Sequence, residues 1–589
     1  METRWIIAPP EELNGSAISW NEICESECIA RLLMRKGFAS AQEVETFLRP
    51  RLSSLSDPFL LPNMQTAVER VLGAVGRHER IVLFGDYDVD GVTSIALLAE
   101  MLRAYGATPE LFLPLRMEEG YGLSGESIER CLEQCRPQLL IAVDCGTSSV
   151  AEVADVRQRG VDVIVFDHHE PKSALPDCVA IVNPKIDPDS PFHYLCSAGI
   201  AFKVCHALLK TRPLDGFDLK RKLDLVALGT VADIVPLRGE NRIFVQRGAI
   251  EIARHRTSPS DPPQDRFVQS ANWQTRSTRP GLKKLIEVSG VRPPILTEDI
   301  GFRLGPRLNA AGRLSTAEKS LQLLLTKDEN EAAALADLLD NQNRERQDVE
   351  RQVFLAAEEQ IAREFDPMRD AAIIVSGRGW HPGVVGIVGS RISRKYHRPT
   401  IVIGFDETGG GKGSGRSIEG LNLVEALDRC TESLEKFGGH EMAAGLTIRE
   451  DKIDTFATAF RRVARELLSD ERLQPCLRID HELLFSDLTA DLLRWHEMLQ
   501  PFGTGNPYPL FFAREVEPTA TRRVANDRHL VLRLRQRNYH QRAIYFDAPN
   551  APLPPSPWDI AFRILANEYE GQTRLDVQIQ ALRKTVAIN

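Results

Sequence analysis

Three carboxylates at alternating positions lie in one short stretch, Gly85-Asp86-Tyr87-Asp88-Val89-Asp90-Gly91. An apolar run at 81–84 precedes it and a run with helical spacing at 94–103 follows it, which predicts a strand, a turn and a helix. Carboxylates held this close repel each other, and a hard divalent cation with oxygen ligands relieves the repulsion. An acidic turn that caps a helix is the alternative, because helix N-caps favour Asp and Gly91 suits a turn. On this stretch alone the two interpretations stay equally open.

Further carboxylates and two histidines stand at the ends of three later apolar runs. Asp144 follows 139–143, Asp167-His168-His169 follows 161–166, and Asp233 follows 225–232. Strands alternate with helical stretches here, which indicates a parallel sheet, and such sheets bind ligands at the carboxyl ends of their strands. Carboxylates together with imidazole suit manganese or another octahedral divalent ion. The sequence therefore predicts a dinuclear metal site built from Asp86, Asp88, Asp90, Asp144, His168, His169 and Asp233.

One long helix is expected to join the two α/β regions of the chain. Helical spacing runs from Glu331 to about Phe365, and its middle, 340–348, is polar on all sides. A helix that is solvated at its centre bridges two domains. A smaller α/β domain follows, with strands expected at 371–375 and 400–403. The expected boundaries are 1–330 for N-terminal helices and the first α/β domain, 331–366 for the helix, 367–465 for the second domain and 466–589 for a C-terminal domain.

The pattern changes from about Leu473 onward. Residues 531–535 and 575–580 alternate between apolar and polar, which is typical of antiparallel strands with one wet face. Residues 511–589 hold eleven Arg and one Lys against eight Asp and Glu, a local net charge of +4. A basic β-barrel with aromatic side chains suits single-stranded nucleic acid, although ordinary packing explains some of the aromatics. The interleaved aromatic residues are Tyr539, Tyr545, Phe546 and Tyr569.

Two glycine-rich stretches could contact an anion. Residues 409–417 combine five glycines that expose backbone amides with the donors Lys412, Arg416 and Ser417. A flexible surface loop is the competing interpretation, and the Gly-Gly-His at 438–440 favours the anion site. The Gly-Tyr-Gly at 120–122 follows Arg116, which could hold a phosphate or pair with a neighbouring glutamate. The sequence alone slightly favours the pairing.

The bulk composition is that of a globular protein with three or four domains. The 589 residues are 43% hydrophobic and 26% charged, which allows a large core. Because there is no run of about 18 apolar residues and no secretory pattern at the N-terminus, we expect no membrane association. The ten scattered cysteines lack zinc spacing and fit a reducing cytoplasm. The net charge of −9 is only weak evidence against nucleic acid, since a local groove can be basic.

Five motifs, in order, resemble the RecJ branch of the DHH phosphoesterase superfamily. They are GDYDVDG at 85–91 with Asp-His-His at 167–169, GPRLNAAGR at 305–313, WHPGVVG at 380–386, GGHEMAAG at 438–445 and PFGTGNP at 501–507. The fourth resembles the GGHxxAAG motif of the DHHA1 domain, and the fifth resembles the entry to the RecJ oligonucleotide-binding domain. The similarity extends from about residue 45 to the C-terminus. The expected fold class is α/β, with a parallel-sheet DHH domain, a smaller DHHA1 domain and a C-terminal OB-like β-barrel.

This resemblance implies a 5′-to-3′ exonuclease that degrades single-stranded DNA to 5′-mononucleotides in recombination and repair. It implies two ions of Mn²⁺ or Mg²⁺, bridged by Asp144. Asp86 and Asp88 would hold one ion, and Asp90, His168 and Asp233 the other, while His169 would contact the phosphate. It also implies a cytoplasmic monomer, with a helicase and a single-strand-binding protein as candidate partners. The expected substrate contacts are Arg116, Asn309, Arg313, Arg416, Ser417 and His440.

Three other functions stay open at this point. A DHH phosphodiesterase for short RNA or cyclic dinucleotides would share the first two domains, but the C-terminal barrel argues against it. A superfamily pyrophosphatase would be a much shorter chain. A non-catalytic replication scaffold would lose ligands, whereas this chain keeps every acidic position. Two departures from the family pattern are a polar insertion at 256–279, expected to be a surface loop, and Ser197, which stands where the family often has glycine.

Overall fold

The computed structural model of the chain describes residues 3–9, 18–115, 119, 122–172, 174–255, 279–314, 316–525, 527–549, 552–569 and 572–585. The chain folds into two compact units. The smaller unit consists of Met1–Arg4, Pro306–Ser320 and Ala333–Leu477. The larger unit consists of Trp5–Gly305, Leu321–Ala332 and Arg478–Asn589.

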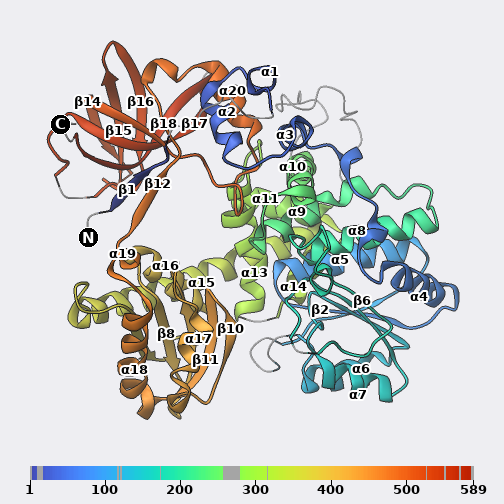
Figure 1. Cartoon of the computed structure of the whole chain (residues 1–589). Helices are drawn as coiled ribbons and strands as arrows, with labels where there is room; N and C mark the ends of the chain where they lie inside the picture. Colours follow the sequence, from blue (N-terminus) through green and yellow to red (C-terminus); the bar gives the residue numbers. More distant parts are fainter. Residues whose placement is uncertain are drawn as a thin grey trace. The chain divides into compact units, whose positions relative to one another are not determined.

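A five-stranded parallel sheet in the larger unit carries the predicted metal ligands (Figure 1). In spatial order its strands are β3 (Glu110–Phe112), β2 (Ile81–Gly85), β4 (Leu139–Val143), β5 (Asp162–Phe166) and β6 (Ala180–Val182). The chain runs from β2 outward to β3 and then returns to β4 on the other side of β2. The gap between the ends of β2 and β4 is thus the topological switch point, where open parallel sheets bind their ligands.

Helices cover both faces of this sheet, which is why its strands are continuous apolar runs. The helices α6 (Gly125–Cys135) and α7 (Val150–Gln158) pack on one face through a shared apolar core (Figure 1). On β2, β5 and β6 the sheet also contacts α5 (Val89–Ala104), α8 (Ser197–Thr211) and α4 (Met64–Gly76), respectively. The apolar run at 225–232 lies in a helix, α9 (Leu223–Ala232), which packs against α5, α8 and α10 (Gly239–Arg254). Because helices surround α9, its sequence is apolar on every side.

The remaining α-helices that end before residue 330 have at most ten residues. They are α1 (Trp20–Ile23), α2 (Glu27–Met34), α3 (Ala41–Leu48), α11 (Pro280–Ser289), α12 (Thr297–Asp299), α13 (Gly305–Leu314) and α14 (Glu318–Leu325). The expected insertion at 256–279 lies outside the described residues except for Arg279, which is buried. Its Nε lies 2.9 Å from Asp224 Oδ2, and His255 Nε2 lies 3.0 Å from the same oxygen. His255, just before the insertion, and Arg279, its last residue, therefore both contact the Asp224 carboxylate of α9.

A closed five-stranded barrel forms the C-terminal part of the larger unit. Around the barrel the strands are β14 (Phe511–Val524), β15 (His529–Gln536), β16 (Tyr539–Tyr545), β18 (Gln572–Lys584) and β17 (Trp558–Tyr569), and β17 pairs back with β14. In β15, Leu532 and Leu534 are buried while Arg533 and Arg535 are exposed, as the alternation predicts. The same region includes β12 (Cys476–Ile479), β13 (His481–Glu482) and α20 (Ala490–Met498), and β12 pairs with β1 (Arg4–Ile7).

The smaller unit is built on a mixed five-stranded sheet. Its spatial order is β10 (Lys436–His440), β11 (Ala443–Arg449), β9 (Gly410–Arg416), β8 (Thr400–Phe405) and β7 (Ile373–Arg378), and its helices are α16 (Pro382–Tyr396), α17 (Leu423–Asp428), α18 (Ile453–Leu467) and α19 (Asp470–Leu473). The surface-loop interpretation of 409–417 is wrong, because 410–416 form β9. A Cβ on Gly411, Gly413 or Gly415 would come within 2.5, 2.8 and 2.7 Å, respectively, of large neighbouring side chains. These glycines make room for side-chain packing and do not mark a flexible loop.

The long helix is present as α15 (Glu329–Glu364), but the expectation that its centre is solvated is wrong on one side. Arg307 Nε of α13 lies 2.8 Å from Asp340 Oδ1, and Arg391 Nη1 of α16 lies 3.0 Å from Glu350 Oε1. The stripe is polar because it pairs with arginines of neighbouring helices, not because water covers it. Its buried members are Asp340, Asn343, Arg346 and Glu350.

The predicted fold class is confirmed by the parallel sheet, the long helix, the second α/β sheet and the closed barrel. No helix in the described part of the chain combines the length and the apolar character that a membrane span requires.

Candidate metal centre and anion-binding strand

The turn after β2 places three carboxylates at the switch point of the parallel sheet. Asp88 is the N-cap of α5, and its Oδ1 accepts a hydrogen bond of 3.1 Å from the Gly91 amide. A Cβ on Gly91 would come within 2.5 Å of the Asp86 carbonyl oxygen, so only glycine allows the helix to start this close to the strand. The capping interpretation of the sequence is thus correct for Asp88. It does not account for Asp86 and Asp90, which are buried.

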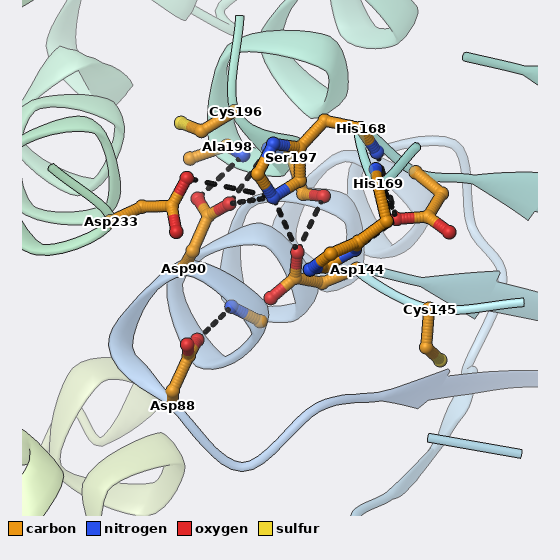
Figure 2. A network of polar contacts seen from close by, with 12 residues as sticks. Asp88, Asp90, Asp144, Cys145, His168, His169, Cys196, Ser197, Ala198 and Asp233 are labelled. Atoms are coloured by element: carbon orange, nitrogen blue, oxygen red, sulfur yellow. Dashed lines mark hydrogen bonds and ion pairs between the residues drawn. The ribbon is translucent and has the colours of Figure 1, made fainter. Parts of the chain in front are cut away.

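The other predicted ligands come from the ends of β4, β5 and α9. Asp144 follows β4 with a positive φ of 63°, a conformation that Asp and Asn tolerate better than other non-glycine residues. His168 and His169 follow β5, and Asp233 is the C-cap of α9. These residues converge at one place (Figure 2). His168 Nε2 lies 3.4 Å from Asp144 Oδ1, 3.5 Å from Asp233 Oδ2 and 3.9 Å from Asp90 Oδ2.

Three overlapping groups of ligand atoms result, each with its atoms within 4.8 Å of one another. Asp144 belongs to two of the groups and His168 to two, which is the arrangement of a site with a shared ligand. The groups are Asp86, Asp88 and Asp144; Asp90, His168 and Asp233; and Asp144, His168 and His169. The first two groups coincide with the two ligand sets that the sequence resemblance implies.

The electrostatics of the cluster favour a bound cation. Burial raises the pKa of Asp90 to about 7, and the neighbouring Asp88 carboxylate adds to the effect. Burial also raises the pKa of Asp233 to about 9, reinforced by Asp90 and Asp88. The pKa of Asp144 lies well above its usual range, because burial and four nearby carboxylates all oppose its charge. A divalent cation removes this repulsion.

The donor atoms also fit a metal ion. Burial lowers the pKa of His168 to about 3, so its imidazole is neutral and can coordinate. His168 Nε2 and Asp233 Oδ2 are buried and make no hydrogen bond among the described residues. Buried polar atoms normally have a partner, and oxygen donors with imidazole match Mn²⁺ or Mg²⁺ chemistry. The three groups of residues therefore have the donor chemistry to hold a divalent ion.

A second cluster of polar side chains lies on the mixed sheet of the smaller unit. Arg416 of β9 and His440 of β10 both pair with Ala443 of β11, so the two side chains share one face, about 10 Å apart at Cα. Arg416 donates to Ser414 Oγ at 2.7 Å and to Ser390 Oγ at 3.0 Å, and burial lowers its pKa. The salt bridges of the described residues include none to Arg416. A largely buried guanidinium without a carboxylate partner favours an anion.

The remaining predicted substrate contacts have different outcomes. The Ser417 hydroxyl donates to the Leu421 carbonyl at 2.7 Å, which closes a turn, whereas Ser414 lies beside Arg416. Asn309 and Arg313 lie on α13, and Arg313 Nη1 donates to the Gly383 carbonyl at 3.1 Å. Arg116 lies outside the described residues. The roles of all four toward a phosphate stay predictions.

Three family models match successive parts of the chain. The DHH family N-terminal domain matches residues 80–230, the DHHA1 domain matches 370–466, and the RecJ OB domain matches 479–581. The single-stranded-DNA-specific exonuclease RecJ of Bacillus subtilis is 34% identical over 584 residues, which cover 98% of this chain and 70% of the relative. The chain belongs to the RecJ family.

Other RecJ proteins extend this similarity. The single-stranded-DNA-specific exonuclease RecJ of Escherichia coli is 35% identical over 94% of this chain and 95% of its own length. The crystal structure of RecJ from Thermus thermophilus in complex with Mn²⁺ superposes with a TM-score of 0.82 at 30% identity, covering 100% of this chain and 80% of that one. The same Thermus protein has also been solved with Mg²⁺. The cluster at the switch point therefore lies within a RecJ fold that binds the predicted ions in a relative.

The sequence interpretation missed the role of Asp167, the first residue of the RecJ Asp-His-His motif. Its Oδ1 accepts hydrogen bonds from His169 Nδ1 at 2.7 Å and from the His168 amide at 2.8 Å. Although burial opposes both charges, this pair lowers the pKa of Asp167 and raises that of His169. Asp167 thus orients His169 and favours its charged form. The motif itself pointed to Asp167, but nothing in its spacing separated a ligand from a carboxylate that holds a histidine.

Proposed function

We propose that this chain is a Mn²⁺- or Mg²⁺-dependent exonuclease that degrades single-stranded DNA from the 5′ end to 5′-mononucleotides. The observation that carries the proposal is the convergence of five carboxylates and two imidazoles, from four elements, at the switch point of the parallel sheet. Membership of the RecJ family supports the choice of substrate. The 5′ polarity and the mononucleotide product rest on the motif resemblance.

Two bound ions would activate a water molecule and neutralise charge on the phosphate and the leaving oxygen. The role of the protein side chains is to fix the geometry of that reaction. Asp144 would hold both ion positions, while Asp86 and Asp88 define one and Asp90, His168 and Asp233 the other. His169, whose charged form Asp167 favours, would donate to a non-bridging phosphate oxygen.

Binding of the strand would use the barrel and the mixed sheet. Arg533 and Arg535 of β15 are exposed, as is Tyr539 of β16, which suits contacts to a phosphate backbone and to bases. Arg416 and His440 would bind the terminal phosphate or the adjacent backbone. A terminus held in this way restricts cleavage to the end of a strand.

Replacing Arg416 by alanine is expected to raise KM for a 5′-phosphorylated oligonucleotide by about 10- to 100-fold, since a hydrogen bond to a charged group contributes about 1.5–3 kcal/mol. KM for the same strand with a 5′-hydroxyl should change much less. Arg449→Ala, an exposed arginine of β11 paired with Gly410 at the far end of the strands, is the matched control. Steady-state kinetics with both oligonucleotides measures this, and an equal rise in KM for both would remove Arg416 from terminus recognition.

The function itself is tested by digesting single-stranded DNA, labelled at its 5′ or its 3′ end, in the presence of Mn²⁺ or Mg²⁺. Early release of the 5′ label as a mononucleotide, with a slowly shortening 3′-labelled strand, is the expected result. Early release of the 3′ label would reverse the polarity. Efficient cleavage of dinucleotides with inert long DNA would favour the alternative, a DHH phosphodiesterase for short RNA or cyclic dinucleotides.

The cellular setting is also part of the proposal. We infer a cytoplasmic monomer that acts in recombination and repair, on strands exposed by a helicase and covered by a single-strand-binding protein. The proposed division into domains is 1–330, 331–366, 367–465 and 466–589. The DHHA1 and RecJ OB family models, at 370–466 and 479–581, support separate third and fourth domains. Sedimentation of the purified chain, with and without an oligonucleotide, measures the oligomeric state.

A further inference from the structure

Ser197 is the first residue of α8, a helix that supplies no ligand to the candidate metal centre. Its side chain is fully buried. The Ser197 hydroxyl donates a hydrogen bond of 2.8 Å to Asp144 Oδ1, and the Ser197 amide donates one of 2.7 Å to Asp90 Oδ2 (Figure 2). One residue thus contacts a carboxylate from each of the two ligand sets.

We propose that Ser197 is a positioning residue that sets the orientation of the Asp144 carboxylate for metal binding. This inference rests on the proposed metal centre. A carboxylate can rotate about its Cβ–Cγ bond, and that rotation is broad when nothing restrains it. Asp144 belongs to two of the ligand groups. In the proposed centre it serves both ion positions, so its two oxygens would be aimed in different directions. The hydrogen bond from the Ser197 hydroxyl to Asp144 Oδ1 restricts this rotation, so that Oδ2 points in a different direction.

The surroundings of Ser197 make this donor rigid. The neighbouring amide of Ala198 donates to Asp90 Oδ1 at 2.8 Å, so the first turn of α8 is tied to the carboxylate at two points. The preceding residue, Cys196, contacts Thr230 Oγ1 of α9 through its Sγ at 3.5 Å. The backbone that carries the hydroxyl is therefore held from both sides. Glycine at this position would keep the two amide bonds to Asp90 but leave Asp144 without the hydroxyl.

Replacing Ser197 by alanine removes the hydroxyl and keeps both amides. Partners that orient metal ligands typically contribute about 10- to 100-fold to metal affinity. We therefore expect Ser197→Ala to raise the dissociation constant for Mn²⁺ at least about tenfold where Asp144 is a ligand. At saturating Mn²⁺ the KM for single-stranded DNA should not change, since the hydroxyl and the amide of Ser197 both donate to carboxylates of the cluster. The Mn²⁺ concentration for half-maximal activity should rise with the dissociation constant.

The direct measurement is the amount of free Mn²⁺, followed by its electron paramagnetic resonance signal, during titration of the purified full-length protein. Ser94→Ala is the matched control, because Ser94 is also buried, lies on α5 and has a hydroxyl that finds no hydrogen-bond partner among the described residues. Should Ser197→Ala fail to fold, Ser197→Cys has the same shape with a weaker donor and should give an intermediate affinity. Ser197→Gly should bind Mn²⁺ as weakly as Ser197→Ala.

The outcomes separate this inference from the proposed function. Wild-type Mn²⁺ affinity in Ser197→Ala, or an equal loss in Ser94→Ala, would overturn the role of Ser197 and leave the metal centre standing. Failure of the wild-type protein to bind Mn²⁺ would instead overturn the metal centre. A rise in KM for DNA at saturating Mn²⁺ would reassign Ser197 to substrate binding.

Discussion

Replacing Asp144 by asparagine is expected to lower kcat on single-stranded DNA by about 1000-fold or more. Asp144 offers an oxygen to two of the three ligand groups. In the proposed assignment it also holds both ion positions, so its charge would be lost from both. Two-ion sites contribute several kcal/mol of transition-state stabilisation, and about 4 kcal/mol corresponds to about 1000-fold in rate. Release of 5′-labelled nucleotide under saturating Mn²⁺ measures the loss.

Asparagine is the informative substitution because of the backbone at this position. Asp144 has a φ of 63°, which asparagine also tolerates, whereas alanine would add strain. Glu133→Gln, an exposed neutralisation on α6, is the control for the change in net charge and should retain wild-type kcat. Activity of Asp144→Asn close to wild type would mean that the centre works without its shared ligand, and the site assignment would then be wrong.

The second large effect is on stability in the absence of metal. With a chelator present, the free energy of unfolding is expected to fall as the pH rises from about 5 to about 9. The folded-state pKa values of Asp90 and Asp233 are raised to about 7 and about 9, above that of an unfolded Asp. A carboxyl group with a raised folded-state pKa contributes stability at low pH, and that stability is lost as the pH rises through the raised value. Between pH 5 and pH 9 Asp90 crosses about two pH units before it ionises and Asp233 about four, so at about 1.4 kcal/mol per unit the loss should approach about 8 kcal/mol.

Metal binding should cancel this pH dependence. An ion at 100 times its dissociation constant adds about 2.7 kcal/mol per site, and binding strengthens as the carboxylates ionise. Urea unfolding at several pH values, with chelator or with excess Mg²⁺, measures the slope of the free energy of unfolding against pH in each condition. Asp144→Asn removes one of the repelling charges, so its slope in chelator should be shallower than that of the wild type. A metal-free protein whose stability is flat over this range would contradict the repulsion inferred from the cluster.

Much of the architecture was predictable because local patterns decide it. The run at 139–143 is apolar and ends in Asp, and it forms β4 with the predicted bounds, since a strand covered on both faces needs apolar residues throughout. The alternation of apolar and polar residues predicted β15, because that strand has one buried face and one exposed face. The candidate metal ligands were also predictable. The strands of a parallel sheet end at the same edge, so carboxylates after β2 and β4 are expected to meet there. Asp233 is different, because it reaches the cluster from the end of helix α9.

The patterns misled where burial depends on a partner distant in the sequence. The polar centre of α15 resembled a solvated helix, yet Asp340 and Glu350 are buried against arginines of other helices. The glycines of β9 resembled a loop, yet they admit side chains of neighbouring strands. The type of a residue shows that it is polar or small, but it does not show which side chain packs against it in the folded protein.

The sequence by itself determined which candidate ligands stand at the ends of the apolar runs, because the apolar pattern that marks each run and its end is a local property. Only the tertiary structure decided what each group does there. Asp167 holds His169 two residues away, which spacing could not distinguish from metal ligation. Ser197 reaches Asp144 across 53 positions of sequence. Hydrogen bonds are directional and short in range, so such roles are set by the packing of α8 on the sheet and not by any motif.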